Sequence, residues 1–242
     1  MNVKFYCICI IILIVSLSIK AQYSIGLDGG YSYNHLNTKI SNRGFTNNKN
    51  ESGFNADMQI NYDLYNFLRL NTGISLTQKN YSLVRDGEYL GEYETFTNTY
   101  FQIPVTIQLE IFKIKEFEFS IKTGLYGAYW AFAKVNGAIP NIFSSTDIVG
   151  NNGQIVQYLS FVKYSEKYQF NKTKDNRFEF GLKTGIGINY PFHKKYSLLA
   201  EFNYVQSITD QQKRYMVNQT QKFNETFSIS VGCLIKLTNK KK

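Results

Sequence analysis

The sequence predicts an all-β fold, a closed antiparallel transmembrane β-barrel of eight strands. Three observations predict it. Apolar and polar residues alternate with a period of two along eight segments. Most segments have about 9–12 residues, close to the ~9–11 that a tilted strand needs to cross a bilayer. Short and long connections alternate between the segments. The composition agrees, because 19 Tyr and 19 Phe accompany one Trp, and only 19% of the 242 residues are charged.

The first four strands follow from this alternation. In residues 23–34 the odd positions are apolar or aromatic, apart from a glycine, and the even positions are small or polar. Residues 54–64 and 68–77 repeat the pattern with the apolar side chains at even positions, and residues 101–111 with them at odd positions. Successive side chains of a strand point to opposite faces of the sheet, so this alternation gives each strand one apolar face and one polar face.

The last four strands show the same period. The apolar face takes the odd positions in 117–129 and 223–237, and the even positions in 178–190 and 196–204. Aromatic residues gather near strand ends, where they are expected to form interfacial girdles. They are Tyr31, Tyr33, Tyr62, Tyr190 and Tyr204.

The connections orient the barrel. Tight turns are expected at 63–66, 112–116 and 191–195, and long polar loops at 34–52, 80–96, 134–176 and 207–221. Short periplasmic turns and long extracellular loops are typical of outer-membrane barrels. The alternative is a soluble exported barrel or sandwich with its apolar face inward. Gly, Ser and Thr on the polar face favour the membrane barrel, because a narrow lumen needs small residues.

Loop 134–176 is the most distinctive connection. Turn-forming residues at 136–153 precede an apolar stretch at 155–162. We expect a hairpin above the membrane that could bind a protein partner; the alternative is an added membrane pair, making ten strands. Basic residues at the base of the loop would contact acidic lipid head groups or a specific anionic partner. They are Lys163, Lys167, Lys172, Lys174 and Arg177.

Residues 1–21 are expected to be a secretory signal peptide, cleaved after Ala21, and residues 22–242 the barrel domain. Lys4 precedes an apolar run that is shorter than a transmembrane helix requires. Cleavage would leave Cys233 as the one cysteine, and would lower the formal net charge from +9 to +7 by removing Lys4 and Lys20. Export makes nucleic acid an unexpected partner in spite of this basic charge, and we expect a monomer in the outer membrane of a Gram-negative bacterium.

Charged residues on the polar face are expected to pair inside the barrel, because a buried charge without a partner is costly. The expected lumen network consists of Asp57, Arg69, Glu110, Glu118, Lys122, Glu179, Lys183 and Glu201, with Asp28 and Lys236 on the same face. Adjacent strands would place Glu118 and Lys122 near Glu110, and would place Glu179 and Lys183 beside Glu201. The functional alternative is a narrow path for ions or solutes.

The sequence offers little catalytic chemistry. His35 and His193 are far apart, so no metal site or cofactor is expected. His35, Ser32, Ser41 and Asp57 are near one another in sequence and could form a lipid-modifying site. That combination is common by chance, and we expect no enzyme activity.

Residues 100–110 (YFQIPVTIQLE) and 119–129 (FSIKTGLYGAY) resemble the PorT-like outer-membrane β-barrel family of Bacteroidetes, in which an aromatic-x-x-Ile-Pro strand precedes a Gly-x-Tyr strand. Residues 70–79, 180–190 and 201–209 resemble other parts of that family. The resemblance implies an outer-membrane barrel without assigned catalytic residues, and some members serve secretion across the outer membrane. It therefore suggests a structural, adhesion or accessory secretion role exercised through the loops.

The last strand carries an expected signal for the barrel-assembly machinery. Its members are Ser230, Gly232, Ile235 and Leu237. The spacing of polar, glycine and apolar residues fits such a signal, although the end is aliphatic where family members often have an aromatic residue.

Overall fold

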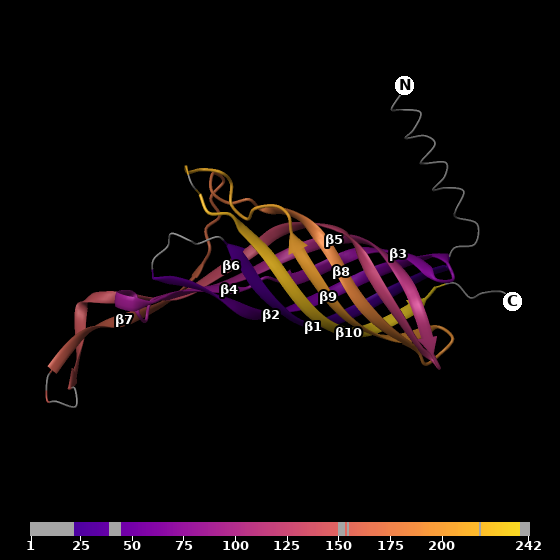
Figure 1. Ribbon diagram of the computed structural model, residues 1–242, viewed down its shortest axis with the longest axis horizontal. Coiled ribbons are helices and arrows are strands. Elements are labelled where there is room, and N and C mark those ends of the chain that lie inside the picture. Colours follow the sequence, from indigo (N-terminus) through magenta and orange to yellow (C-terminus); the bar gives the residue numbers. More distant parts are fainter. Residues whose placement is uncertain (1–21, 39–44, 150–152, 154, 218, 238–242) are drawn as a thin grey trace, which may run out of the picture.

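The computed structural model describes residues 22–38, 45–149, 153, 155–217 and 219–237. The expected signal peptide at 1–21 and Ser41 lie outside these residues. The molecule is an elongated antiparallel barrel from one end of which a two-stranded hairpin projects (Figure 1). In the part of the chain that the structure describes, no helix is long and apolar enough to cross a membrane.

The described residues form ten strands. They are β1 (Gln22–Thr38), β2 (Thr46–Tyr65), β3 (Leu68–Gln78), β4 (Tyr81–Arg85), β5 (Tyr93–Ile114), β6 (Phe117–Val149), β7 (Ile155–Lys167), β8 (Phe178–Pro191), β9 (Tyr196–Ser207) and β10 (Lys222–Lys236). A short 3₁₀ turn, η2 (Gly87–Tyr89), connects β4 to β5.

Eight of these strands close into a ring, in the order β1, β2, β3, β5, β6, β8, β9, β10. The ring closes because β1 pairs along its length with both β2 and β10. β4 continues the position of β3 and pairs with the first residues of β2 and β5. β7 pairs only with β6 among the described residues, so it adds no strand to the ring. The predicted eight-stranded closed barrel is confirmed.

The long connections differ from the prediction. Residues 34–38, 46–52, 81–85 and 93–96 are strand, and so are 134–149 and 155–167. β5 therefore has 22 residues and β6 has 33. The alternation stops where the strands extend beyond the hydrocarbon layer of the membrane, although the backbone hydrogen-bond ladder continues. β-forming residues such as Thr95, Phe96 and Thr97 sustain the strands there.

The outer wall is apolar along the ring. Large hydrophobic side chains that are exposed on it include Leu27, Met58, Ile74, Ile103, Ile107, Leu125, Phe180, Ile186, Leu198 and Val231. Their neighbours in each strand point inward and are buried or half-buried. An apolar surface of this extent is stable only against lipid.

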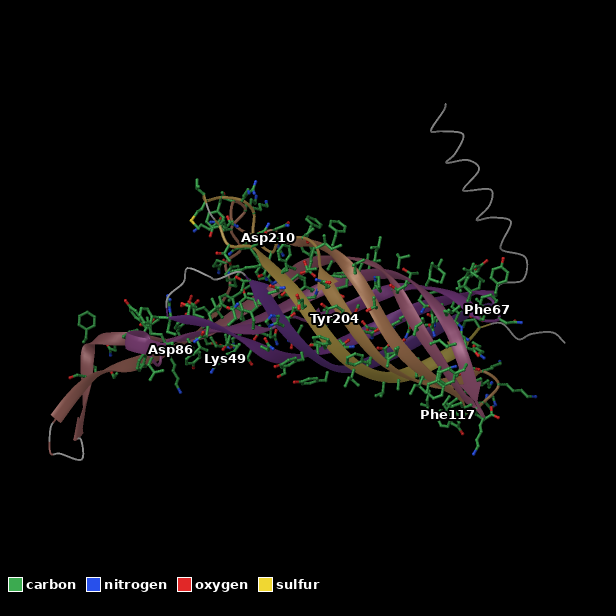
Figure 2. All side chains as sticks on the ribbon, viewed as in Figure 1. Lys49, Phe67, Asp86, Phe117, Tyr204 and Asp210 are labelled. Carbon is green, nitrogen blue, oxygen red and sulfur yellow. The ribbon has the colours of Figure 1, made fainter. Side chains whose placement is uncertain are left out.

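Short turns at 66–67, 115–116 and 192–195 connect the ring strands at one end, as predicted. Aromatic pairs surround this end, including Tyr23 with Tyr62 and Phe117 with Tyr190, whose ring centroids are 5.1 Å and 4.9 Å apart. Phe67 and Phe117 mark this end in Figure 2, and Asp86 marks the opposite, extended end.

Candidate functional site

The interior of the barrel is polar and filled by side chains. Strand alternation directs one residue in two inward. Fully or almost fully buried polar residues include Ser32, Asn34, Asn61, Asn71, Ser75, Asn98, Asn203, Asn224, Thr226 and Ser230. Three groups of charges are distributed along this interior.

The first group lies toward the extended end and centres on Lys79, between β3 and β4. Its side chain is fully buried, and its ammonium pairs with Glu179 of β8 across the interior. The Tyr126 hydroxyl and the Asn224 amide donate to the same carboxylate, at 2.7 Å and 2.8 Å. The Lys79 ammonium also lies over the rings of Tyr100 and Tyr126.

The second group lies midway along the barrel. Lys122 of β6 pairs with Glu201 of β9, and both side chains are buried. The pair crosses β8, where Gly185 stands directly between Lys122 and Asn203 in the sheet. Because Gly185 has no side chain, the lysine can reach over the strand. A Cβ at Gly185 would lie 2.5 Å from Asn203 Oδ1.

Two carboxylates complete this middle group. Asp28 and Asp57 are opposite each other on β1 and β2. Asp28 accepts a hydrogen bond from Gln59 at 2.9 Å, and Asp57 accepts from Ser75. A cavity of about 20 Å³ between these groups is also lined by Lys183. That volume holds about one water molecule.

The third group lies at the short-turn end. Arg69 donates to Asp63 at 2.8 Å and lies 3.9 Å from Glu118. Glu118 also pairs with Lys113 at 3.3 Å. Glu110 is half-buried near Arg69, Lys113 and Glu118. No described cation lies within 4.0 Å of its carboxylate.

An aromatic cap closes the interior above Lys79. It consists of Tyr100, Trp130, Tyr168 and Phe170. Trp130 is buried, and its ring stacks on Tyr100 and Tyr168 at centroid distances of 5.8 Å and 5.6 Å. Gln211, from the loop after β9, donates to the Tyr100 hydroxyl at 3.0 Å. The cap therefore joins the segment after β7 and the loop after β9 to the barrel wall.

The pairing differs in part from the sequence expectation. Lys122 pairs with Glu201 rather than with the Glu110 region, and Glu179 pairs with Lys79. Lys183 stays near Glu201 without taking its hydrogen bond. Sequence reasoning missed Lys79, which lies between the predicted strand 68–77 and the predicted loop 80–96. Its odd number was a usable signal, because the odd positions of this strand, from Arg69 to Thr77, are the polar ones.

Among the described residues, Ser32 and His35, which were considered for catalysis, do not converge. Ser32 is buried inside the barrel and donates to the Gln78 carbonyl at 2.9 Å. His35 is three positions further, so it faces the other side of β1, where it contacts Asn50 at 2.7 Å. Among the described residues, no group of three or more His, Cys, Asp or Glu is placed to hold a metal ion.

The β6–β7 ribbon (residues 139–149 and 155–162) is the second notable feature. β5 pairs with β6 only as far as Ala138. Beyond that residue, β7 is the sole described strand beside β6. The register shifts between Asn141 and Ser145, and Phe143 at this bulge is 90% exposed. Bulges often redirect a side chain in this way.

An eight-stranded closed barrel with an apolar wall and a packed, charged interior defines an integral barrel protein of the outer membrane. The family described as outer membrane protein beta-barrel domain matches residues 20–213, and the chain belongs to this family. The short-turn end is therefore periplasmic, and the end that carries the ribbon is extracellular.

No curated protein matches the chain. Among solved structures, it is similar to Neisserial surface protein A, with 13% identity over 90% of this chain and 99% of that one, at a TM-score of 0.48. It is similar to OprG from Pseudomonas aeruginosa, with 9% identity over 88% and 95% and a TM-score of 0.48. It is also similar to Ail of Yersinia pestis, solved in complex with the heparin analogue sucrose octasulfate, with 14% identity over 88% and 99% and a TM-score of 0.39.

Proposed function

We propose that the protein acts through its extracellular β6–β7 ribbon, as an adhesion or accessory secretion component that binds a protein partner by strand addition. The observation that carries this proposal is the ribbon, both edges of which are unpaired among the described residues. Unpaired edges present rows of N–H and C=O groups that readily accept another strand.

The composition of the ribbon supports a protein partner. Of residues 139–162, 11 are aliphatic or aromatic, and one, Asp147, is charged. An isolated two-stranded hairpin is marginally stable in water. Edge strands that face water are normally protected from further pairing by charged side chains, which this ribbon largely lacks. A bound strand would complete the sheet and cover the apolar side chains.

The bulge supplies an anchor for such a partner. Asn141 accepts a hydrogen bond from the Phe143 N–H at 3.1 Å, and Ser160 donates to the Ser144 carbonyl at 3.0 Å. These bonds fix the backbone that presents Phe143. Exposed aromatic rings frequently supply much of the binding energy in protein interfaces.

The packed interior argues against a pore. The Lys79 pair crosses the lumen, the Lys122 pair is buried inside it along the wall, and the aromatic cap covers its extracellular end. A narrow eight-stranded barrel normally has room only for its own side chains. We therefore expect no single-channel conductance in planar bilayers, and discrete conductance steps would favour the pore instead.

The PorT-like resemblance supports the secretion form of this proposal. We also infer a cleaved signal peptide at 1–21, a monomeric barrel in the membrane, and an assembly signal at Ser230, Gly232, Ile235 and Leu237. Ser230 and Gly232 lie on the ladder between β10 and β1, where the barrel closes. A recognition signal on this strand would act before closure.

The test removes the ribbon without disturbing the barrel. Residues 140–161 are replaced by Asn-Gly, which joins the cross-strand partners Ile139 and Val162 through a two-residue turn. A matched control replaces residues 86–91 by Asn-Gly, and so removes the neighbouring exposed tip at Leu90. A heat-dependent shift on a denaturing gel checks that both variants form the barrel.

Cells without the protein are complemented with the wild type, the ribbon variant or the control. We expect the ribbon variant to match the null cells in surface attachment or in the set of secreted proteins, and the control to match the wild type. Wild-type behaviour of a folded ribbon variant in both assays would refute the proposal.

A further inference from the structure

A groove lies on the outer wall of the barrel at its extracellular rim, separate from the ribbon. Its volume is about 270 Å³. Three aromatic rings and three cations are the chief groups that line it. They are Tyr129, Phe170, Phe178, Lys172, Arg177 and Lys213. The combination of rings and cations at one place is not accounted for by barrel closure or by the interior charge network.

The height of the groove follows from β8. The apolar outer face of this strand runs from Phe178 to Tyr190. Twelve steps at about 3.3 Å, tilted by about 40°, span roughly 30 Å, close to the apolar band of an outer-membrane barrel. Phe178 is therefore at the outer edge of the apolar layer, and Arg177 is one residue beyond it. The groove lies at the level of the outer-leaflet head groups.

Arg177 is held in place by the barrel wall. Its Nε and Nη2 atoms donate to the carbonyls of Trp130 and Ala131, at 2.9 Å and 3.1 Å. Its guanidinium lies over the rings of Tyr129 and Phe170, at 4.4 Å and 4.1 Å from their centroids. These bonds use two of its five N–H donors, so three are left for a ligand. An ordered guanidinium loses little entropy on binding an anion.

The two lysines belong to neighbouring segments. The Lys213 ammonium donates to the Lys172 carbonyl at 2.9 Å, which connects the loop after β9 to the segment before β8. Both side chains are exposed. Asp175 is the one carboxylate among the described residues that line the groove. It already accepts hydrogen bonds from the Tyr168 hydroxyl at 2.9 Å and the Asn171 N–H at 2.6 Å.

We propose that this groove binds the phosphate of a phosphorylated lipid in the outer leaflet. Lys172, Arg177 and Lys213 would hold the phosphate, because a net positive groove complements an anion and arginine recognises phosphate through paired N–H groups. The lipid chains would lie below, along Phe178 and the apolar wall. The aromatic side chains that line the groove continue into this apolar wall, which favours a lipid over a free anion.

The experiment measures binding of lipid A to the full-length barrel in neutral detergent micelles. Native mass spectrometry counts retained lipid for bis-phosphorylated lipid A and for the same lipid after removal of its phosphates. The test variant is Lys172→Glu with Lys213→Glu. The control is Lys163→Glu with Lys167→Glu, which makes the same change of charge on β7, outside the groove. Arg177 is left unchanged because it also supports the wall.

We expect the wild type to retain phosphorylated lipid A at least about tenfold more tightly than the dephosphorylated form, and the test variant to lose that preference. The control should keep it. Equal retention of the two lipids by the wild type would overturn the proposal, and so would equal losses in test and control variants. Displacement of the lipid by inorganic phosphate at millimolar concentration would indicate a free-anion site and would also overturn it.

Discussion

Removing either member of the buried pair between Lys79 and Glu179 should destabilise the barrel by several kcal/mol. The side chains are 0% and 5% exposed, so solvent screens neither charge. Breaking a buried ion pair by removing one partner typically costs about 3–5 kcal/mol, because the remaining charge stays buried.

The structure predicts which loss is larger. In Lys79→Met, the Glu179 carboxylate keeps the hydrogen bonds from Tyr126 and Asn224, so we expect about 3 kcal/mol. In Glu179→Gln, the Lys79 ammonium loses its anion and keeps the Tyr126 hydroxyl at 3.4 Å and two ring faces. We expect about 4–5 kcal/mol there. The double variant should cost less than the sum, since replacing a whole buried pair is often close to neutral.

Urea unfolding in lipid vesicles, followed by Trp130 fluorescence, gives the free energy of unfolding for each variant. Lys113→Met is the control, because Lys113 is 45% exposed in its pair with Glu118 and such pairs contribute about 0–1 kcal/mol. If both single variants lose no more free energy of unfolding than the Lys113→Met control, the reasoning is refuted. A larger loss for Lys79→Met than for Glu179→Gln would refute the proposed asymmetry.

Three further predictions concern closure, the ribbon base and the cap. Gly232→Ala would place a Cβ 2.2 Å from the Leu27 carbonyl oxygen, so it should reduce the heat-shifted fraction on gels. In the control Gly29→Ala, the new Cβ would lie 3.6 Å from its nearest atom, so assembly should not change. Equal assembly of the two variants would contradict this prediction. Burial, with the hydrogen bond to Glu94, raises the pKa of Tyr164 from 10.0 to about 12. The stabilisation of the folded protein by neutral Tyr164 is therefore present below pH 10 and lost as pH rises through about 12. The difference between the ultraviolet titrations of the wild type and Tyr164→Phe should have its midpoint near 12. A midpoint near 10 would count against the raised pKa. Phe170 packs on Trp130, the one tryptophan in the chain, with ring centroids 5.0 Å apart. Phe170→Ala should therefore shift the Trp130 emission to the red, and the control Phe161→Ala should leave it unchanged. Equal emission of the two variants would contradict the cap.

The ring strands could be predicted because lipid imposes a strict rule on them. Each outward residue must be apolar, and each inward residue must fit a narrow polar interior. The pattern disappears above the membrane, where both faces of a strand contact water. That is why the sequence predicts loops at 46–50 and 93–96 although backbone pairing continues through these residues.

The site was less predictable because pairing across a barrel depends on register. The parity of Glu179 and Lys122 placed both inside, but their partners lie across the lumen or beyond an intervening strand. Only the alignment of Gly185 with Lys122 shows that the path to Glu201 is open. Phe143 depends on a register shift between β6 and β7, and a single sequence has no simple signal for that shift.

The continuity of β6 has a mechanical consequence. Its 33 residues run without interruption from the periplasmic turn to the ribbon. A pull on the ribbon would be transmitted along this strand into the barrel wall, where β6 is bonded to β5 and β8. Hydrogen bonds in antiparallel sheets lie perpendicular to the strands, so tension along β6 loads many of them at once in shear. The wall can thus resist force on the ribbon without separating one bond at a time.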